Sequence, residues 1–260
     1  MAHAKKKSYG QHFLHDAGVI EKIVDSAEVG TDEIIVEIGP GEGALTKEIV
    51  KIFPSHKLIL AEADRDLIPG LGEKFPTTVI IQGDAAKLDT EAMLQEAGAS
   101  SWVLFGNLPY SAAAPILMNA LYVETPPREL VIMVQKEQGD RMRAKPGEMS
   151  LLSVATQLAS DVKQLFTVGP GAFTPPPKVE SVVLRLTPKP RPENAQNIIK
   201  LAKAGFSARR KQLHGNLSRE SVATSDEAKT ALKNIGLKET ARAQELSIEE
   251  WTELVSLLGD

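Results

Sequence analysis

Four consecutive residues, Asn107-Leu108-Pro109-Tyr110, follow an apolar stretch and combine groups that bind rather than titrate. The Asn107 amide does not ionise, Pro109 fixes the backbone, and Tyr110 offers an aromatic face. Such groups suit the recognition of a planar amine, such as the amino group of a nucleobase, better than acid–base catalysis. An ordinary turn, in which Asn107 caps a following helix and Pro109 begins it, would use the same residues.

A glycine-rich turn supplies a second candidate site. Gly39, Gly41 and Gly43 follow another apolar stretch and allow the backbone to turn tightly and to approach a ligand. The third glycine of a dinucleotide fingerprint would stand at position 44, which is alanine here. Pro40 also lacks the amide hydrogen that a phosphate would need. The turn therefore favours a ligand without phosphates.

Two acids are predicted at the ends of the next two strands. Glu62 could accept hydrogen bonds from both hydroxyls of a ribose, and Asp84 could accept one from the amino group of an adenine. Either acid alone is equally well explained as a surface residue at a strand end. Together with the Gly39 turn they fit S-adenosylmethionine better than NAD. A dehydrogenase remains an alternative, although no convincing site for hydride transfer accompanies it.

Methyl transfer to an aromatic amine needs alignment more than it needs a base. The lone pair of such an amine is delocalised into the ring, and hydrogen-bond acceptors on both of its hydrogens would favour a pyramidal, nucleophilic nitrogen. The Asn107 side-chain oxygen and the Leu108 carbonyl can be those acceptors, while Tyr110 stacks on the base. Because the proton can leave after the attack, this chemistry requires no His–Asp pair or paired carboxylates.

A parallel sheet would bring these positions together at one edge. Apolar strands alternate with helices between residues 34 and 134, which is typical of a doubly wound α/β fold, and ligands bind at the carboxyl ends of such strands. Two later strands could add an antiparallel edge. The predicted strands span residues 34–38, 57–61, 77–82, 102–105 and 130–134, followed by 162–168 and 181–186.

The chain is predicted to divide at a proline-rich stretch. Residues 187–192 alternate proline with other residues and are the best linker candidate, because such sequences favour an extended path. We therefore predict a sheet domain over residues 1–187, which begins with a basic arm at 1–15, and an all-helical domain over residues 188–260. The helices expected in the second domain span residues 195–206, 209–217, 225–235 and 247–258.

The 260 residues carry a net charge of −4, include no cysteine and contain no apolar run of membrane length. We therefore expect a cytoplasmic protein without disulfides, a membrane span or a metal site. The acidic balance argues mildly against a nucleic-acid partner, and each basic cluster alone is typical of a solvated surface. The candidates for contacts with nucleic-acid phosphates are Lys5, Lys6, Lys7, Arg141, Arg143, Lys178, Arg209, Arg210 and Lys211.

In its ordered motifs the chain resembles the KsgA-type dimethyladenosine transferases, which modify small-subunit ribosomal RNA. The resemblance covers nearly the whole chain. It implies a Rossmann-like class I methyltransferase sheet, mostly parallel with an antiparallel edge strand, and a small helical domain that binds RNA. The matching motifs are residues 9–14, 36–41, Glu62 with 64–67, 83–85, 107–110, 135–137, 173–179, and Phe206 with 209–211.

The same resemblance implies roles for individual residues. Asn107 to Tyr110 would hold the target adenine, and Phe173 would stack on its other face after the base leaves an unpaired loop. The product would be N6-dimethylation of two adjacent adenosines in the 3′-terminal hairpin of small-subunit RNA, made by a monomer acting on a precursor of the small ribosomal subunit. S-adenosylmethionine would contact His12, Leu14, Gly39, Gly41, Glu62, Asp84, Ala85 and Asn107.

Two departures from the family pattern keep alternatives open. Residues 111–114 are smaller than is usual after the corner, and the segment after Gly147 is shortened. One alternative is an RNA-binding assembly factor whose methylation is weak or lost. Another is a macrolide-resistance-type transferase that acts on large-subunit RNA. The proline motif at 173–179 and the basic residues at 209–211 favour the small subunit.

Overall fold

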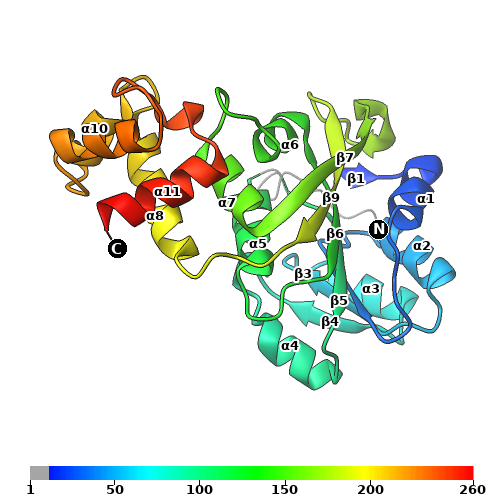
Figure 1. Cartoon of the computed structure of the whole chain (residues 1–260). Coiled ribbons are helices and arrows are strands. Elements are labelled where there is room, and N and C mark those ends of the chain that lie inside the picture. The colour runs from blue at the N-terminus through cyan, green and yellow to red at the C-terminus, as the bar shows by residue number, and fades with distance from the viewer. Residues whose placement is uncertain (1–11, 110, 260) are drawn as a thin grey trace. The chain divides into compact units, whose positions relative to one another are not determined.

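The computed structural model describes residues 12–109 and 111–259. The chain forms two compact units (Figure 1). The sheet unit comprises the described residues up to Gly139 together with Asp161–Pro188, and the helical unit comprises Asp140–Ser160 and the described residues from Lys189 onward. Four predicted site residues lie outside the described chain, namely Lys5, Lys6, Lys7 and Tyr110.

A seven-stranded sheet with the order β4-β3-β2-β5-β6-β9-β7 forms the centre of the sheet unit. The strands from β4 to β6 are parallel, and β9 is antiparallel to β6, so the predicted fold class is confirmed. β2, β3 and β5 are almost entirely buried, which explains why their sequences are largely apolar. The strands are β2 (Ile34–Ile38), β3 (Leu58–Glu62), β4 (Val79–Gln82), β5 (Trp102–Asn107), β6 (Glu129–Gln135), β7 (Ser160–Val168) and β9 (Ser181–Pro188).

Helices precede, connect and follow the parallel strands of this sheet (Figure 1). The first begins at its predicted cap, because the Asp16 carboxylate accepts a hydrogen bond from Val19 N at 3.0 Å. No helix in the two described ranges is long and apolar enough to span a membrane. The helices are α1 (Ala17–Asp25), α2 (Ala44–Ile52), α3 (Ile68–Lys74), α4 (Thr90–Ala97), α5 (Ala113–Leu121) and α6 (Lys136–Met142).

A separate two-stranded ladder joins segments from opposite ends of the sheet unit. β1 (Phe13–Leu14) pairs antiparallel with β8 (Phe173–Thr174), so that Leu14 pairs with Phe173. The hydrogen bond from His15 N to Ala172 O, at 2.9 Å, extends the ladder. The ladder attaches the end of the predicted N-terminal arm to the body.

The helical unit has its own apolar core around the fully buried Trp251. Met149, Val154 and Leu158 belong to this core, so the segment Asp140–Ser160 groups with the C-terminal helices. The predicted division at residue 187 placed that segment in the other domain. The elements are α7 (Leu151–Ala159), α8 (Ala195–Gly205), the 3₁₀ helix η4 (Phe206–Ala208), α9 (Leu213–Arg219), α10 (Ser225–Asn234), η5 (Ala243–Glu245) and α11 (Ile248–Leu258).

The predicted helix at 209–217 is wrong in its first turn. Arg209–Lys211 form a turn between η4 and α9 instead. The buried side chain of Asn216 explains the difference, since its Nδ2 donates hydrogen bonds to Gly205 O at 2.5 Å and to Ala208 O at 3.0 Å. These bonds satisfy carbonyl groups at the end of the preceding helix and stabilise the turn.

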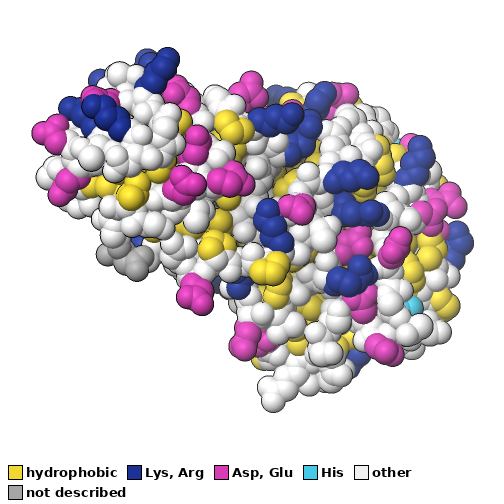
Figure 2. All heavy atoms as spheres, viewed as in Figure 1, with side chains coloured by type: hydrophobic (Ala, Val, Ile, Leu, Met, Phe, Trp, Pro, Cys, Tyr) yellow, Lys and Arg dark blue, Asp and Glu magenta, His cyan; other side chains and the backbone are white. Residues whose placement is uncertain are grey.

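Charged side chains of both signs are interspersed on the face that Figure 2 shows. Lys and Arg side chains stand there in small groups next to Asp and Glu side chains. The net charge of −4 is therefore compatible with local basic clusters, which the sequence predicted.

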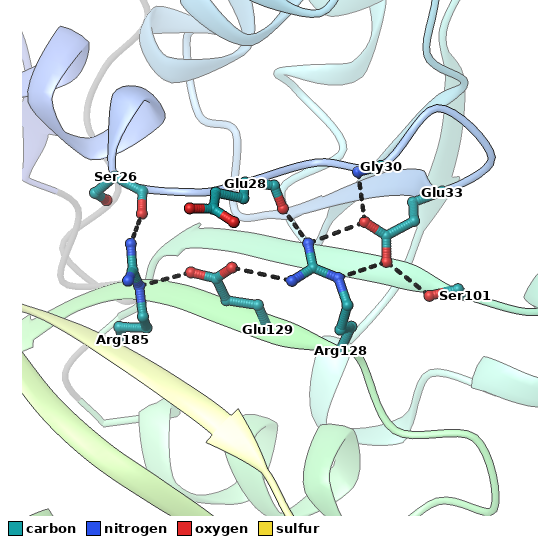
Figure 3. Close-up of polar contacts among 8 residues, drawn as sticks. All are labelled: Ser26, Glu28, Gly30, Glu33, Ser101, Arg128, Glu129 and Arg185. Atoms are coloured by element: carbon teal, nitrogen blue, oxygen red, sulfur yellow. Dashed lines mark hydrogen bonds and ion pairs between the residues drawn. The ribbon is translucent and has the colours of Figure 1, made fainter.

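A cluster of ion pairs, here named the arginine clasp, lies near the amino ends of the parallel strands β2, β5 and β6 (Figure 3). The Glu33 carboxylate accepts hydrogen bonds from Arg128 Nε at 2.7 Å and Nη2 at 2.9 Å. Glu129 Oε1 lies 2.7 Å from Arg185 Nε, and its Oε2 lies 3.5 Å from Arg128 Nη1. Both guanidinium groups also donate to main-chain carbonyl oxygens after α1, those of Ser26 and Glu28. The clasp therefore fixes the connection between α1 and β2.

Candidate active site

The glycine turn has the backbone that its sequence predicted. Gly39, Gly41 and Gly43 have φ angles of +68°, +59° and +85°, in the left-handed region that favours glycine. At Gly41 space is a second constraint, because an added Cβ would lie 3.0 Å from Phe13 Cε1. The turn therefore passes close against β1.

Glu62, at the end of β3, contacts the glycine turn from the neighbouring strand. Its Oε2 accepts a hydrogen bond from Gly41 N at 3.1 Å, and its Oε1 accepts one from Asp64 N at 2.8 Å. Only 6% of the residue is exposed. Burial raises the pKa of Glu62, although these backbone hydrogen bonds favour the charged form. The two N–H donors fix the carboxylate, which can accept further hydrogen bonds from ligand hydroxyls.

The loop after β4 lies beside the end of β3, since Gly83 N donates to Glu62 O at 2.9 Å. The exposed Asp84 accepts a hydrogen bond from Ala86 N at 3.0 Å and begins the 3₁₀ helix η2 (Ala85–Lys87). The first residue of η2 is buried. Glu62 and Asp84 therefore stand at adjacent strand ends, which is the arrangement that their spacing predicted.

Asn107 ends β5, and its side chain does not cap the next helix. Its Nδ2 donates to His12 O at 3.3 Å. At the start of α5, Pro109 O accepts hydrogen bonds from Ala112 N and Ala113 N, each at 2.9 Å, and no side chain caps the helix. The ordinary capping turn therefore does not explain the asparagine.

His12 and Phe173 are adjacent to, or part of, the β1–β8 ladder. His12 Nδ1 lies 2.7 Å from Pro175 O, and Leu14 is buried in the same apolar cluster as Phe173. Only 3% of Phe173 is exposed. Its predicted stacking on a base would therefore require part of the ring to be uncovered.

Contacts link most of the predicted site residues into one region of the sheet unit. A Cβ added to Gly39 would lie 3.7 Å from Asn107 O, so the glycine turn and the Asn107 corner are neighbours. His12 joins the corner, and Glu62 joins the turn to the Asp84 loop. Within residues 12–109 and 111–259, no group of three or more His, Asp or Glu side chains could hold a metal.

The described basic residues that were predicted to bind RNA are exposed. Arg143 forms an ion pair with Asp140 at 2.6 Å. Lys178 belongs to the sheet unit, and the others belong to the helical unit, where Arg209–Lys211 occupy the turn before α9. That these residues form one common RNA-binding surface stays a prediction.

Sequence reasoning missed one buried acid beneath the glycine turn. Glu37 is 1% exposed, and its Oε2 accepts a hydrogen bond from Thr46 Oγ1 at 2.6 Å, which joins β2 to α2. Burial raises the pKa of Glu37 to about 8. The available signal was a single acid within an apolar strand, two residues before Gly39.

Comparison with known proteins tests the resemblance. The model of a protein family described as Ribosomal RNA adenine dimethylase matches residues 2–260. Ribosomal RNA small subunit methyltransferase A of Synechococcus elongatus is 36% identical over 270 residues, which cover 98% of this chain and 95% of the relative. The protein of the same name from Hahella chejuensis is 37% identical over 270 residues, with coverages of 100% and 95%.

Solved structures agree with these relatives. A dimethyladenosine transferase from Plasmodium falciparum superposes with a TM-score of 0.76 at 25% identity, covering 94% of this chain and 96% of that one. The 23S rRNA methyltransferase ErmE shares the fold, with a TM-score of 0.71 at 23% identity and coverages of 95% and 99%. The resemblance is confirmed, and the chain belongs to the ribosomal RNA adenine dimethylase family.

Proposed function

We propose that this protein transfers methyl groups from S-adenosylmethionine to the N6 amino groups of two adjacent adenosines in the 3′-terminal hairpin of small-subunit ribosomal RNA. The observation that carries the proposal is the position of Asn107. Its amide is held by His12 O, and its backbone is a neighbour of Gly39. An adenine amino group at this corner would stand beside the proposed cofactor site.

The residues around the glycine turn fit S-adenosylmethionine. The fixed carboxylate of Glu62 would accept from the ribose hydroxyls, and Asp84 would accept from the adenine amino group. Pro40 offers no amide to a phosphate, which is compatible with a phosphate-free cofactor. When bound, S-adenosylmethionine supplies an electrophilic methyl group on a sulfonium sulfur. The remaining proposed contacts are His12, Leu14, Gly39, Gly41, Ala85 and Asn107.

Asn107 and Leu108 would hold the target amine. Because Asn107 Nδ2 donates to His12 O, its Oδ1 is the atom that can accept from the substrate. Among the described residues, no group donates a hydrogen bond to Leu108 O, so this carbonyl can be the second acceptor. Two acceptors would keep the nitrogen near attack geometry, and its proton would leave after the attack. Tyr110 and Phe173 are the proposed stacking partners of the base.

The proposed substrate also assigns a role to the basic clusters. We propose that the protein acts as a monomer in the cytoplasm, on a precursor of the small ribosomal subunit. Positively charged side chains would contact RNA phosphates, while the helical unit recognises the shape of the RNA. The proposed contacts are Lys5, Lys6, Lys7, Arg141, Arg143, Lys178, Arg209, Arg210 and Lys211.

A methylation assay tests the proposal. Small ribosomal subunits that lack these methyl groups are incubated with the protein and S-adenosylmethionine labelled in its methyl group, with fully methylated subunits as the control. We expect label in N6,N6-dimethyladenosine at both target positions. Absence of label, under conditions in which a family member is active, would contradict the proposal.

The same assay separates the two alternatives. The shared fold with ErmE makes large-subunit RNA the second substrate to test. Label that enters only large-subunit RNA would support that activity instead. Binding to small subunits without any transfer would support an assembly factor.

A further inference from the structure

Asn119 is a side chain of α5 that reaches the loop after β4. Its Nδ2 donates to Ala85 O at 3.1 Å and to Leu88 O at 2.9 Å. Both hydrogens of the amide are therefore engaged, one with a carbonyl at the start of η2 and one with the carbonyl just after it. The two bonds attach this loop to a helix outside it.

The loop needs such an attachment because it follows an edge strand. β4 contains four residues, none of them buried, and it pairs only with β3 among the described strands. Asp84 is exposed, and its own hydrogen bonds stay within the loop, with Ala86 N at 3.0 Å and Lys87 N at 2.8 Å. The direction of this carboxylate therefore depends on how the whole loop is held.

The helix that carries Asn119 also begins at the Asn107 corner, where Pro109 O accepts its first N–H groups. Asn119 lies six residues after Ala113, which is about 9 Å along the helix axis at 1.5 Å per residue. One helix thus contacts the corner proposed for the target base and the loop proposed for the cofactor. A helix is stiff over this length, so it can keep the two parts in register.

We propose that Asn119 is a positioning residue that sets how Asp84 distinguishes adenine from other bases in the cofactor. The proposal deepens the proposed function and rests on it. An adenine offers a hydrogen-bond donor at position 6, whereas hypoxanthine has an oxygen there, which a carboxylate repels. When Asn119 holds the Asp84 loop, the Asp84 carboxylate stays in place and binds adenine in preference to hypoxanthine. When the loop is released, the carboxylate adapts and the discrimination weakens.

Asn119→Asp tests the proposal with almost no change in side-chain size, because a carboxylate cannot donate and would face two carbonyl oxygens. Asn119→Ala is the milder variant, to be used if the first fails to fold. Asn194→Asp, in the helical unit, makes the same change of charge at a side chain without a capping hydrogen bond and is the matched control. Calorimetry measures Kd for S-adenosylhomocysteine and S-inosylhomocysteine with each protein.

We expect the wild type and Asn194→Asp to prefer S-adenosylhomocysteine. In Asn119→Asp the ratio of the two Kd values should fall about fivefold to tenfold, the loss of roughly one hydrogen bond. Amide hydrogen exchange without ligand should accelerate at Ala86 and Lys87, while β2 keeps its protection. A general loss of stability would affect β2 as well.

An unchanged Kd ratio in the Asn119 variants would overturn the proposal, whether or not exchange at η2 changes. Equal binding of both compounds by the wild type would also overturn it, because Asp84 would then not read the base. Methyl transfer to ribosomal subunits does not depend on this discrimination, so that assay still tests the proposed function separately.

Discussion

The amide nitrogen of Asn107 donates a 3.3 Å hydrogen bond to the carbonyl oxygen of His12, which lies 95 residues earlier in the chain. This bond directs the nitrogen towards the segment that leads into β1 and leaves the side-chain oxygen for a substrate. The N-terminal segment is therefore part of the proposed site for the target base.

Asn107→Ala is expected to lower the rate of methyl transfer by about 10²- to 10³-fold. An effect of this size is typical when a protein loses one preorganised hydrogen-bonding group that stabilises the transition state. The free energy of unfolding should fall by only about 1 kcal/mol, because one hydrogen bond within the protein is lost. Single-turnover transfer to undermethylated subunits and a thermal melt measure the two effects. Asn234→Ala, at an exposed position in α10, is the control. Full activity of Asn107→Ala would remove this residue from the mechanism.

Glu37→Gln should change how stability depends on pH. The pKa of Glu37 rises from an ordinary 4.5 to about 8, chiefly because burial disfavours its charged form. The folded state thus holds the proton more tightly than the unfolded state, and this contribution to stability is present below pH 4.5 and is lost as the pH rises to about 8. Glutamine does not titrate but can still accept from Thr46.

Urea unfolding of the wild type and Glu37→Gln measures that difference. Between about pH 5 and about pH 8, the free energy of unfolding of the wild type should fall by on the order of a few kcal/mol relative to that of the variant. A difference that stays constant across this range would mean that Glu37 does not titrate in it.

Arg128→Met should weaken the arginine clasp. Burial opposes the charge of Glu33, but hydrogen bonds from Arg128, Gly30 N and Ser101 outweigh it and lower the pKa to about 2. The ionised Glu33 therefore stabilises the fold above pH 4.5, and this contribution is lost as the pH falls towards 2. Because the Arg128 side chain is 44% exposed, we expect a loss of about 1–3 kcal/mol near neutral pH.

The loss caused by Arg128→Met should shrink in acid, which urea unfolding at several pH values would show. Arg143→Met removes an exposed ion pair with Asp140 and should cost less than about 0.5 kcal/mol. Equal losses in the two variants would show that the clasp contributes no more than a surface pair.

Replacing Arg209 and Arg210 together by serine should weaken RNA binding and flatten its salt dependence. Two lost phosphate contacts lower the slope of log K against log salt by about 1.4 to 1.8. Binding to small-subunit RNA at several salt concentrations measures the slope. Lys229→Ser with Lys233→Ser, at positions that pair with nearby acids, is the control of equal charge. An unchanged slope would remove Arg209 and Arg210 from the interface.

Local signals explain why most of the fold could be predicted from the sequence. β2 and β5 are mostly apolar, and glycines mark the turn after β2, so neither prediction depended on distant residues. The turn at Arg209–Lys211 could not be predicted, because the buried Asn216 that stabilises it follows it in the chain. The grouping of Asp140–Ser160 with the C-terminal helices depends on packing between two segments that residues 161–188 separate in the chain, and it has no local signal.

In the candidate site, too, some features could be predicted from the sequence and others could not. The positions of Glu62 and Asp84 at adjacent strand ends followed from the order of strands and helices. The burial of Phe173 did not, because it results from a two-residue ladder with β1 that is too short to leave a periodic pattern. Glu37 was missed because its hydrogen-bond partner, Thr46, lies in α2. The two residues come together only when α2 packs on the sheet.

The β1–β8 ladder must form late during synthesis, because the ribosome makes β1 long before β8. His12 contacts a carbonyl 163 residues later, and β1 can form its ladder with β8 only after Phe173 and Thr174 have left the ribosome. A growing chain can already form the glycine turn and the Asn107 corner, yet its first strand stays unpaired. The proposed site would therefore be completed late in synthesis, after β8 has been added to the chain.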